Sequence, residues 1–239
     1  MNIHEFKRGL IVSCQAQPDE PFFGSDYMAK MAVAAEMGGA IGVRVNTVPD
    51  IVAVRKAVSI PVIGIIKRQY PDCYPYITPT IREVQEVADT GADIVAVDAT
   101  KLLKPDGKTT EQFIHHIKER FDLLVMADVS TAEEGVAAWK AGADIVATTL
   151  AGYTEYTREK SDLPMELREP NFDIISELAD RIEVPVVAEG RFWDYRNAVK
   201  AMSLGAYSVV IGAGITRPQI ITQKNVMEIN RYLTSLRSI

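Results

Sequence analysis

The sequence predicts an α/β fold: a single eight-stranded (β/α) TIM barrel domain that spans residues 1–239. Three observations predict this fold. The chain has 239 residues, close to the roughly 250 residues typical of one such barrel. Short apolar runs alternate with segments of helical periodicity along the whole chain. These runs are almost continuously apolar, which is typical of parallel strands that helices cover on both faces.

Eight apolar runs rich in valine and isoleucine are the expected strands. In chain order they are GLIVSCQA (9–16), AIGVRVN (40–46), PVIGIIK (61–67), ADIVAVDAT (92–100), LLVMADVS (123–130), ADIVATTL (143–150), PVVAEGR (185–191) and YSVVIGAGIT (207–216). Between the runs, apolar residues recur at helical spacing, as at Met28, Met31 and Ala35. Each of these segments is therefore expected to place one apolar stripe against the sheet.

Signals for helix ends support this alternation. Glycine precedes alternate strands, where it is expected to end a helix in the left-handed conformation, at Gly39, Gly91, Gly142 and Gly205. Capping boxes are expected at Thr80 with Glu83 and at Ser130 with Glu133. The alternative is an open doubly wound sheet, but no GxGxxG motif follows the first strand and the sequence contains no P-loop motif. The pattern therefore favours a closed barrel.

Composition limits the classes of partner. Apolar residues make up 47% of the chain and charged residues 24%, an ordinary balance for a globular protein. The net charge of −6 provides no general attraction for nucleic acid, so an anionic ligand requires a local basic pocket. Cys14 and Cys73 form no CxxC or zinc-like pattern, and the N-terminus resembles neither a signal peptide nor a membrane span. We expect a cytoplasmic protein with no nucleic-acid or membrane partner.

Two connections are longer than a simple barrel turn requires, residues 68–79 and residues 151–171. They follow the third and the sixth expected strands, at the end of the barrel where active sites lie. Both are candidate walls or lids of a site. Ordinary surface insertions are the alternative interpretation of each loop.

A lysine and a glutamate end expected strands on opposite sides of the ring. Lys67 follows an apolar run, where poor hydration is expected to lower the pKa of its amine and make the neutral base accessible. Glu189 ends the seventh run, so the two groups could remove a proton from one face of a carbon and return it to the other. The alternatives are a Lys67 that reaches water, pairs with Asp98, or forms a direct ion pair with Glu189.

Further polar residues at strand ends are expected to surround the same cavity and to hold hydroxyl, amide or developing enolate oxygens of a ligand: Gln15, Arg44, Asp128 and Thr148. Arg44 could equally be balanced by Asp98. No histidine ends a strand, which argues against a metal-dependent mechanism and against a catalytic triad. Asp98, Asp128 and Glu189 could hold magnesium, but carboxylates beside lysine and arginine are more simply interpreted as substrate contacts. We therefore expect no metal.

A phosphate site is expected after the last two strands, at Gly190, Arg191, Gly212, Gly214 and Arg217. Glycines permit close approach of the backbone, and arginine adds a cationic fork that matches phosphate. The loops after the seventh and eighth strands of such barrels frequently form a phosphate site, helped by a helix N-terminus. The alternative is that the glycines serve tight turns alone.

Seven segments now form a recognisable set. They are GLIVSCQA with Gln15, IGVRVN with Arg44, PVIGIIK with Lys67, MADVST with Asp128, ADIVATTLAGYT, PVVAEGR with Glu189, and ITRPQIIT with Arg217. Together they resemble the N-acetylmannosamine-6-phosphate 2-epimerase family, from about residue 8 to residue 230. The resemblance implies a barrel isomerase of amino-sugar and sialic acid catabolism. Such an enzyme converts N-acetylmannosamine 6-phosphate into N-acetylglucosamine 6-phosphate without a nicotinamide or flavin cofactor.

The resemblance also implies roles for individual residues. Lys67 and Glu189 match the catalytic pair of the family, and Arg217 with its neighbouring glycines matches the phosphate clamp. The positions that match sugar contacts are Gln15, Arg44 and Asp128. We expect a homodimer. The segment around Cys73 and the pair Phe192-Trp193 depart from the family pattern, which leaves the oligomer contacts and the loop geometry open.

Two other functions compete with this interpretation. An indole-glycerol-phosphate synthase-like barrel also combines lysine, glutamate and a phosphate site, although its aromatic substrate requires a larger apolar pocket. A non-catalytic phosphate-sensing barrel that binds RNA or a regulatory partner would use the strand-end residues as a receptor, but the acidic net charge argues against RNA.

Overall fold

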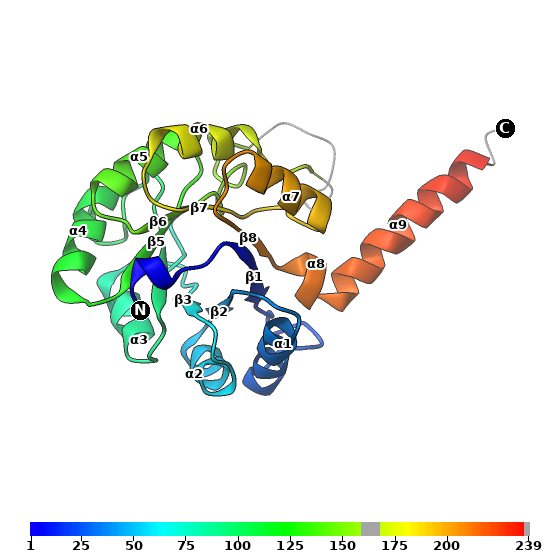
Figure 1. Cartoon of the computed structure of the whole chain (residues 1–239), viewed down its shortest axis with the longest axis horizontal. Helices are drawn as coiled ribbons and strands as arrows, with labels where there is room; N and C mark the ends of the chain where they lie inside the picture. The colour runs from blue at the N-terminus through cyan, green and yellow to red at the C-terminus, as the bar shows by residue number, and fades with distance from the viewer. Residues whose placement is uncertain (159–167, 237–239) are drawn as a thin grey trace.

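Eight parallel strands pair in sequence order, and β1 closes the ring by pairing with β8 (Figure 1). This computed structural model describes residues 1–158 and 168–236. The strands are β1 Gly9–Cys14, β2 Gly42–Asn46, β3 Val62–Ile65, β4 Ile94–Asp98, β5 Leu124–Asp128, β6 Ile145–Ala147, β7 Val186–Ala188 and β8 Ser208–Ile211. Each lies within one of the expected apolar runs, so the predicted eight-stranded (β/α) barrel is confirmed.

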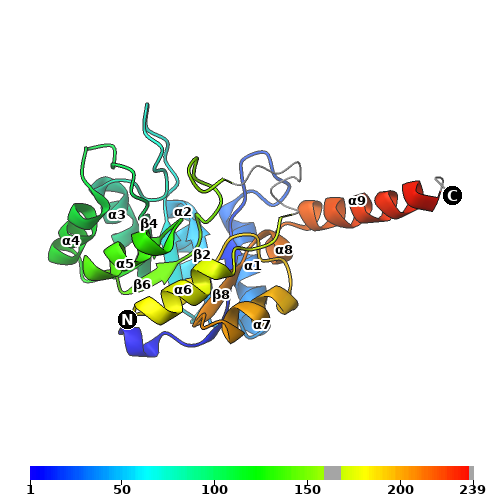
Figure 2. The same cartoon turned by 90° about the horizontal axis from the view of Figure 1, so that it is seen from above.

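Helices follow the strands, and all of them except the last, α9, lie around the outside of the barrel (Figures 1 and 2). They are α1 Ser25–Met37, α2 Val48–Ala57, α3 Ile81–Ala88, α4 Thr110–Arg120, α5 Ala132–Lys140, α6 Asp173–Arg181, α7 Tyr195–Ser203, α8 Ala213–Thr216 and α9 Pro218–Leu236. A short 3-10 helix, η1 (Ile3–Glu5), precedes β1. Among the described residues, no helix is both long enough and apolar enough to cross a membrane.

The helix-end signals are largely confirmed. The four glycines expected in the left-handed conformation all have positive φ, between 76° and 102°. Thr80 and Glu83 form the expected capping box at the start of α3. The box expected at Ser130 and Glu133 was placed one residue too early, because Thr131 caps α5 together with Glu134. Ser130 instead donates its hydroxyl to the Glu134 carboxylate at 2.7 Å.

Side chains fill the inside of the barrel, which confines ligand binding to its ends. Ile11, Ile63, Ile94, Met126 and Ile145 are fully buried in one inner cluster. Two further clusters pack the outer faces of the strands against the helices. The polar residues that follow the strands therefore emerge from an apolar plug at its C-terminal end.

The loop after β3 is a folded arm. Isolated antiparallel bridges join Lys67 to Ile77 and Tyr70 to Cys73, and Figure 2 shows the arm rising above the barrel. The Tyr74 hydroxyl donates to the backbone oxygen of Tyr153 at 2.5 Å, which links the arm to the loop after β6. Of that second loop, expected as a wall or lid over 151–171, residues 159–167 lie outside the described part of the chain.

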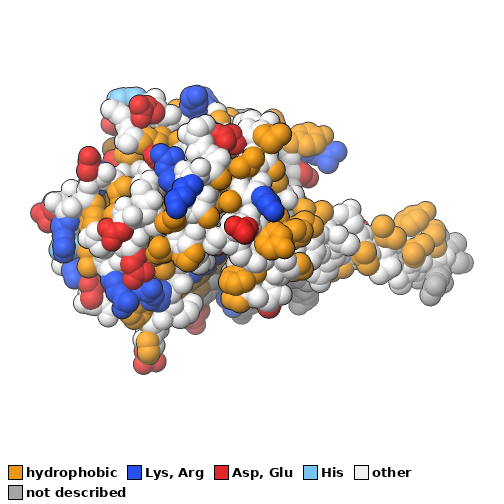
Figure 3. Space-filling view, turned by 90° about the horizontal axis from the view of Figure 1, so that it is seen from below, with side chains coloured by type: hydrophobic (Ala, Val, Ile, Leu, Met, Phe, Trp, Pro, Cys, Tyr) orange, Lys and Arg blue, Asp and Glu red, His pale blue; other side chains and the backbone are white. Residues whose placement is uncertain are grey.

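The eighth helical unit differs from the others. After β8 comes the single turn α8, and α9 then projects away from the barrel (Figure 1) with none of its residues buried. An apolar groove of about 390 Å³ lies on the barrel beside α8, lined by Leu10, Val12, Met31, Ala34, Ala35, Gly38, Ala40, Ile215 and Thr216. Figure 3 shows hydrophobic side chains along α9 and on the barrel surface from which it projects. The single domain expected over residues 1–239 stays a prediction.

Candidate active site

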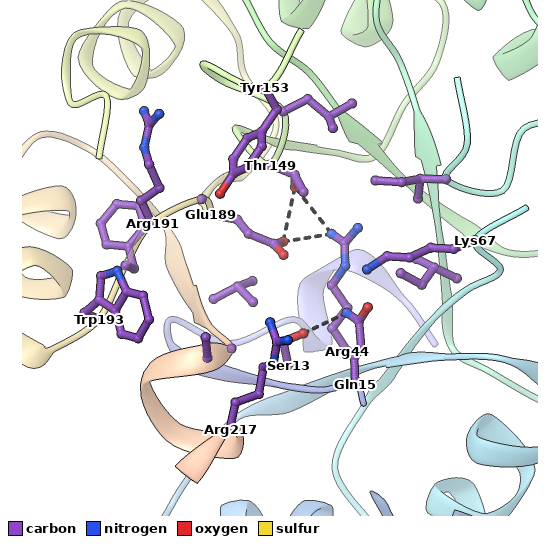
Figure 4. Close-up of a pocket in the computed structure, with 18 of the residues that line it drawn as sticks. Ser13, Gln15, Arg44, Lys67, Thr149, Tyr153, Glu189, Arg191, Trp193 and Arg217 are labelled. Carbon is purple, nitrogen blue, oxygen red and sulfur yellow. Dashed lines mark hydrogen bonds and ion pairs between the residues drawn. The ribbon is translucent and has the colours of Figure 1, made fainter. Parts of the chain in front are cut away.

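A cavity of about 380 Å³ opens at the C-terminal ends of the strands (Figure 4). Eight of the eleven expected site residues line it: Gln15, Arg44, Lys67, Glu189, Gly190, Arg191, Gly212 and Arg217. Arg44 lies in β2, Arg217 lies between α8 and α9, and the others directly follow β1, β3, β7 or β8. The closure of the barrel thus brings together residues that are up to 202 positions apart in the chain, from Gln15 to Arg217.

A buried arginine connects two carboxylates at the bottom of this cavity. Arg44, only 1% exposed, donates from Nη1 to Asp128 Oδ1 at 2.9 Å and to Glu189 Oε2 at 2.8 Å. Its Nη2 donates to Asp128 Oδ2 at 2.5 Å. The Thr149 hydroxyl lies 2.7 Å from Asp128 Oδ1 and 3.2 Å from Glu189 Oε2. Because a hydroxyl has one proton, Thr149 can donate to only one of these carboxylates at a time.

Lys67 enters the cavity from the side opposite to Glu189, with Arg44 between them (Figure 4). Lys67 is exposed at the mouth of the cavity, so the alternative in which its amine reaches water stays open. Desolvation by the surrounding residues, followed by the positive charge of Arg44, lowers the pKa of Lys67 to about 8. The described residues include no ion pair between Lys67 and Glu189, which removes that alternative for this structure. Nor does Lys67 pair with Asp98, because Asp98 Oδ1 lies 3.5 Å from the buried Lys104 Nζ.

The Glu189 carboxyl is also perturbed. Burial raises the pKa of Glu189, and the negative charge of Asp128 adds to this effect, while Arg44 opposes it. The cavity therefore holds an amine and a carboxyl whose pKa values are both shifted toward neutrality. A pair of this kind can exchange protons with a ligand near neutral pH.

Three expected residues do not line the cavity, each for a physical reason. Asp128 is fully buried beneath it, since its two oxygens are occupied by Arg44 and Thr149. Thr148 points away, because its hydroxyl bonds the backbone of Glu189, donating to the oxygen at 2.9 Å and accepting from the nitrogen at 3.1 Å. A Cβ on Gly214 would lie 2.5 Å from the backbone oxygen of Trp193, so this glycine permits close packing of two loops.

The basic end of the cavity lies between the loops after β7 and β8. Gly190 and Arg191 both have positive φ, 102° and 65°. The Arg191 guanidinium lies 5.8 Å from the centre of the Tyr153 ring. Gly212 and Arg217 complete the wall, and Arg217 contacts the Glu20 carboxylate. Arg44, Lys67, Arg191 and Arg217 make this cavity locally cationic in a chain of net charge −6.

Several lining residues were not among the eleven expected site residues: Ser13, Tyr76, Thr149, Tyr153 and Trp193. Thr149 was adjacent to the residue that was chosen, and a one-residue error at a strand end exchanges inward and outward side chains. Tyr76 lies in the arm after β3, whose return toward the cavity depends on the bridge between Lys67 and Ile77. The sequence predicted this loop as a wall of the site, but not which of its side chains would face the cavity.

A closed parallel barrel with a cationic pocket and an amine-carboxyl pair at its C-terminal end defines a TIM-barrel protein equipped for acid-base chemistry on an anionic ligand. The chain matches the NanE family, described as "Putative N-acetylmannosamine-6-phosphate epimerase", over residues 28–231. Because this match covers most of its length, the chain belongs to that family.

Individual relatives agree with this assignment. A protein of Caldanaerobacter subterraneus described as "Putative N-acetylmannosamine-6-phosphate 2-epimerase" is 53% identical, over 94% of this chain and 92% of the relative. Its counterpart in Clostridium perfringens is 44% identical, over 91% of this chain and 95% of the relative. The solved structure of the Clostridium perfringens 2-epimerase matches with a TM-score of 0.86 and 42% identity, covering 94% of both chains.

The electrostatics of the cavity predict how Lys67 titrates. Competitive labelling with acetic anhydride across pH, followed by mass spectrometry of the peptides, should show half-maximal reactivity of Lys67 near pH 8. Arg44→Met should raise that pKa, because it removes a positive charge and leaves Asp128 and Glu189 uncompensated. Arg68→Met is the matched control, since Arg68 pairs with Glu83 and Glu86 outside the cavity. A Lys67 that titrates near 10.5 in the wild type would contradict the described environment.

Proposed function

We propose that this chain is an epimerase that interconverts N-acetylmannosamine 6-phosphate and N-acetylglucosamine 6-phosphate by proton removal and return at C2, in amino-sugar and sialic acid catabolism. The observation that carries the proposal is the approach of Lys67 and Glu189 to one cationic cavity from opposite sides. Family membership supports the substrate, and the relatives named above carry the same activity in their descriptions.

The chemistry follows from these two groups. In the open-chain sugar the C1 carbonyl makes the C2 hydrogen acidic. The neutral Lys67 amine takes that proton, and the electron pair of the C–H bond becomes an enolate whose charge rests on the C1 oxygen. Glu189, in its carboxylic acid form, then donates its proton to the opposite face of C2. The reverse reaction exchanges the roles of the two groups, so neither metal nor redox cofactor is needed.

The remaining residues bind and orient the substrate in this proposal. Gln15 faces the cavity with its Oε1 unpartnered and buried among the described residues, ready to accept from a hydroxyl or amide. Arg44 Nε lacks a partner in the same way and can donate to the developing enolate oxygen. Asp128 and Thr148 support the site without lining it. Asp128 accepts from Arg44, and Thr148 donates to the Glu189 backbone oxygen. The expected contacts to the phosphate come from Gly190, Arg191, Gly212 and Arg217.

The direct test is isotope exchange. The protein is incubated with N-acetylmannosamine 6-phosphate in deuterated water, and C2 is followed by proton NMR. Deuterium should appear at C2 of newly formed N-acetylglucosamine 6-phosphate. Substrate recovered early should carry much less deuterium, because the second proton comes from a different group. An absence of both exchange and product would exclude the epimerase.

Removal of either acid-base group should abolish most of the turnover. Lys67→Ala and Glu189→Ala are each expected to lower kcat by about two or more powers of ten, the usual contribution of a positioned acid or base. Arg217→Ala should instead chiefly raise KM, because its contact is remote from C2. Circular dichroism and thermal melting check that each variant is folded. A Lys67→Ala variant with near-normal kcat would rule out the assigned base.

The pH dependence distinguishes two bases from one. The two-base mechanism requires one proton shared between Lys67 and Glu189, so kcat/KM should fall as pH rises through about 8 and Lys67 loses that proton. It should also fall at acidic pH, when both groups are protonated. A lysine that acts alone requires its neutral form, so kcat/KM would rise through pH 8 and then level off. Measurement of kcat/KM from pH 5 to pH 10 separates the two.

We also propose that the protein functions in the cytoplasm as a homodimer in which α9 of each copy covers the groove beside α8 of the other. Val226, Ile229, Leu233 and Leu236 lie three or four residues apart, so they form one apolar stripe along α9, and all four are exposed. Burial of an exposed side chain of this kind stabilises by about 1.5–3 kcal/mol.

The groove fits such a stripe. It is apolar and lies between α1 and α8, where the eighth helix of a (β/α) barrel would pack. The α9 helix of the same copy does not fill this groove. A single residue separates it from α8, and it runs from Pro218 away from the barrel. A second copy of the chain supplies a matching helix for each groove, and two-fold symmetry makes the exchange reciprocal.

Charge placed on the apolar stripe should therefore dissociate the dimer. In sedimentation equilibrium the wild type should be dimeric, whereas Leu233→Glu should raise the dimer dissociation constant at least about a hundredfold, as expected for a buried unpaired charge. Ala34→Glu, on the exposed rim of the groove, should have the same effect. Ser235→Glu places the same charge on the opposite face of α9 and should leave the dimer intact. A monomeric wild type would end the proposal.

A further inference from the structure

Glu20 is a buried carboxylate beside the cationic end of the cavity. It lies in the connection between β1 and α1, and its side chain is only 8% exposed. Its Oε1 contacts Arg217 Nη2, and its Oε2 accepts from the backbone nitrogen of Gln17 at 2.9 Å. The mechanism proposed above does not use this carboxylate, although it touches the arginine assigned to the phosphate.

The contacts of Glu20 hold it in place. Burial alone raises the pKa of Glu20, but hydrogen bonds from the Gln17 backbone, from Arg217 and from Gln219 outweigh that effect and lower it. The carboxylate is therefore ionised at neutral pH. Donors from the β1–α1 connection and from the start of α9 converge on it, so a rotation of its side chain would leave them without an acceptor.

The contact occupies only part of the Arg217 fork. A guanidinium has five N–H donors, and Glu20 takes one at Nη2. Arg217 Nε is buried and has no partner among the described residues, and Arg217 lines both the main cavity and its extension toward Gln17. A buried donor without an acceptor indicates a position that a ligand oxygen fills.

We propose that Glu20 is a positioning residue that holds Arg217 with its remaining donors directed at the substrate phosphate. This inference rests on the proposed function, because it assumes that Arg217 binds that phosphate. Glu20 fixes the side chain before the ligand arrives, so the conformational entropy of a long arginine is lost on folding and not on binding. If Glu20 instead competed with phosphate for Arg217, loss of its charge would tighten phosphate binding.

The test compares Glu20→Gln with Asp19→Asn in the full-length protein. Asp19 is exposed and adjacent, so its substitution changes the net charge equally without touching Arg217. Calorimetry measures binding of inorganic phosphate and of N-acetylglucosamine 6-phosphate, and kinetics measure kcat and KM separately. Glu20→Gln should weaken phosphate binding and raise KM by roughly tenfold, with kcat changed by less than about threefold. Asp19→Asn should match the wild type in every measurement.

A conservative variant and thermal melting guard against a merely structural effect. Glu20→Asp keeps the charge on a shorter side chain, so it should bind phosphate with an affinity between those of the wild type and Glu20→Gln. Tighter phosphate binding by Glu20→Gln would identify a competitor and overturn the proposal. A lower melting temperature with unchanged phosphate affinity would overturn it as well. Failure of the epimerase is recognised separately, because the wild type would then show no exchange at C2.

Discussion

The buried guanidinium of Arg44 is the interaction on which the site depends. It emerges from β2 and holds Asp128 on β5 and Glu189 after β7, so one side chain joins three separate parts of the ring. Loss of one partner from a buried charge cluster costs about 3–5 kcal/mol, because the other charges stay desolvated. Closure of the barrel and geometry of the acid-base pair are therefore stabilised by the same contacts.

The fold could be predicted because its signals are local and repeated. A strand covered on both faces must be apolar throughout, as in ADIVAVDAT around β4, and a helix that turns back toward the sheet ends at a left-handed glycine such as Gly142. Neither signal depends on distant residues. Eight of the residues that line the cavity followed from the same reasoning, since closure brings every strand end to one mouth.

The unpredicted features depend on contacts between segments that are distant in the chain. Thr148 and Thr149 have the same chemistry, and only the position where β6 ends decides which of them faces Arg44. Gly214 resembled a phosphate-binding glycine, but the Trp193 backbone occupies the space beside its Cα. The position of α9 was not predicted either, because sequence periodicity shows which face of a helix is apolar and not which molecule covers it.

The net charge of the chain does not describe the electrostatic potential at the cavity, because cationic side chains are concentrated there. The four cations around the cavity are only partly neutralised, since Glu189 and Asp128 bind Arg44 while Glu20 takes a single Nη of Arg217. An excess of positive charge over a desolvated mouth attracts a dianion and, through Arg44, also favours the neutral form of Lys67. A bound phosphate would offset part of that positive charge. The phosphate contacts and Lys67 are thus electrostatically coupled. Bound phosphate should therefore raise the fraction of protonated Lys67 at a given pH. This favours the state in which Lys67 and Glu189, the two proposed catalytic groups, hold one proton between them.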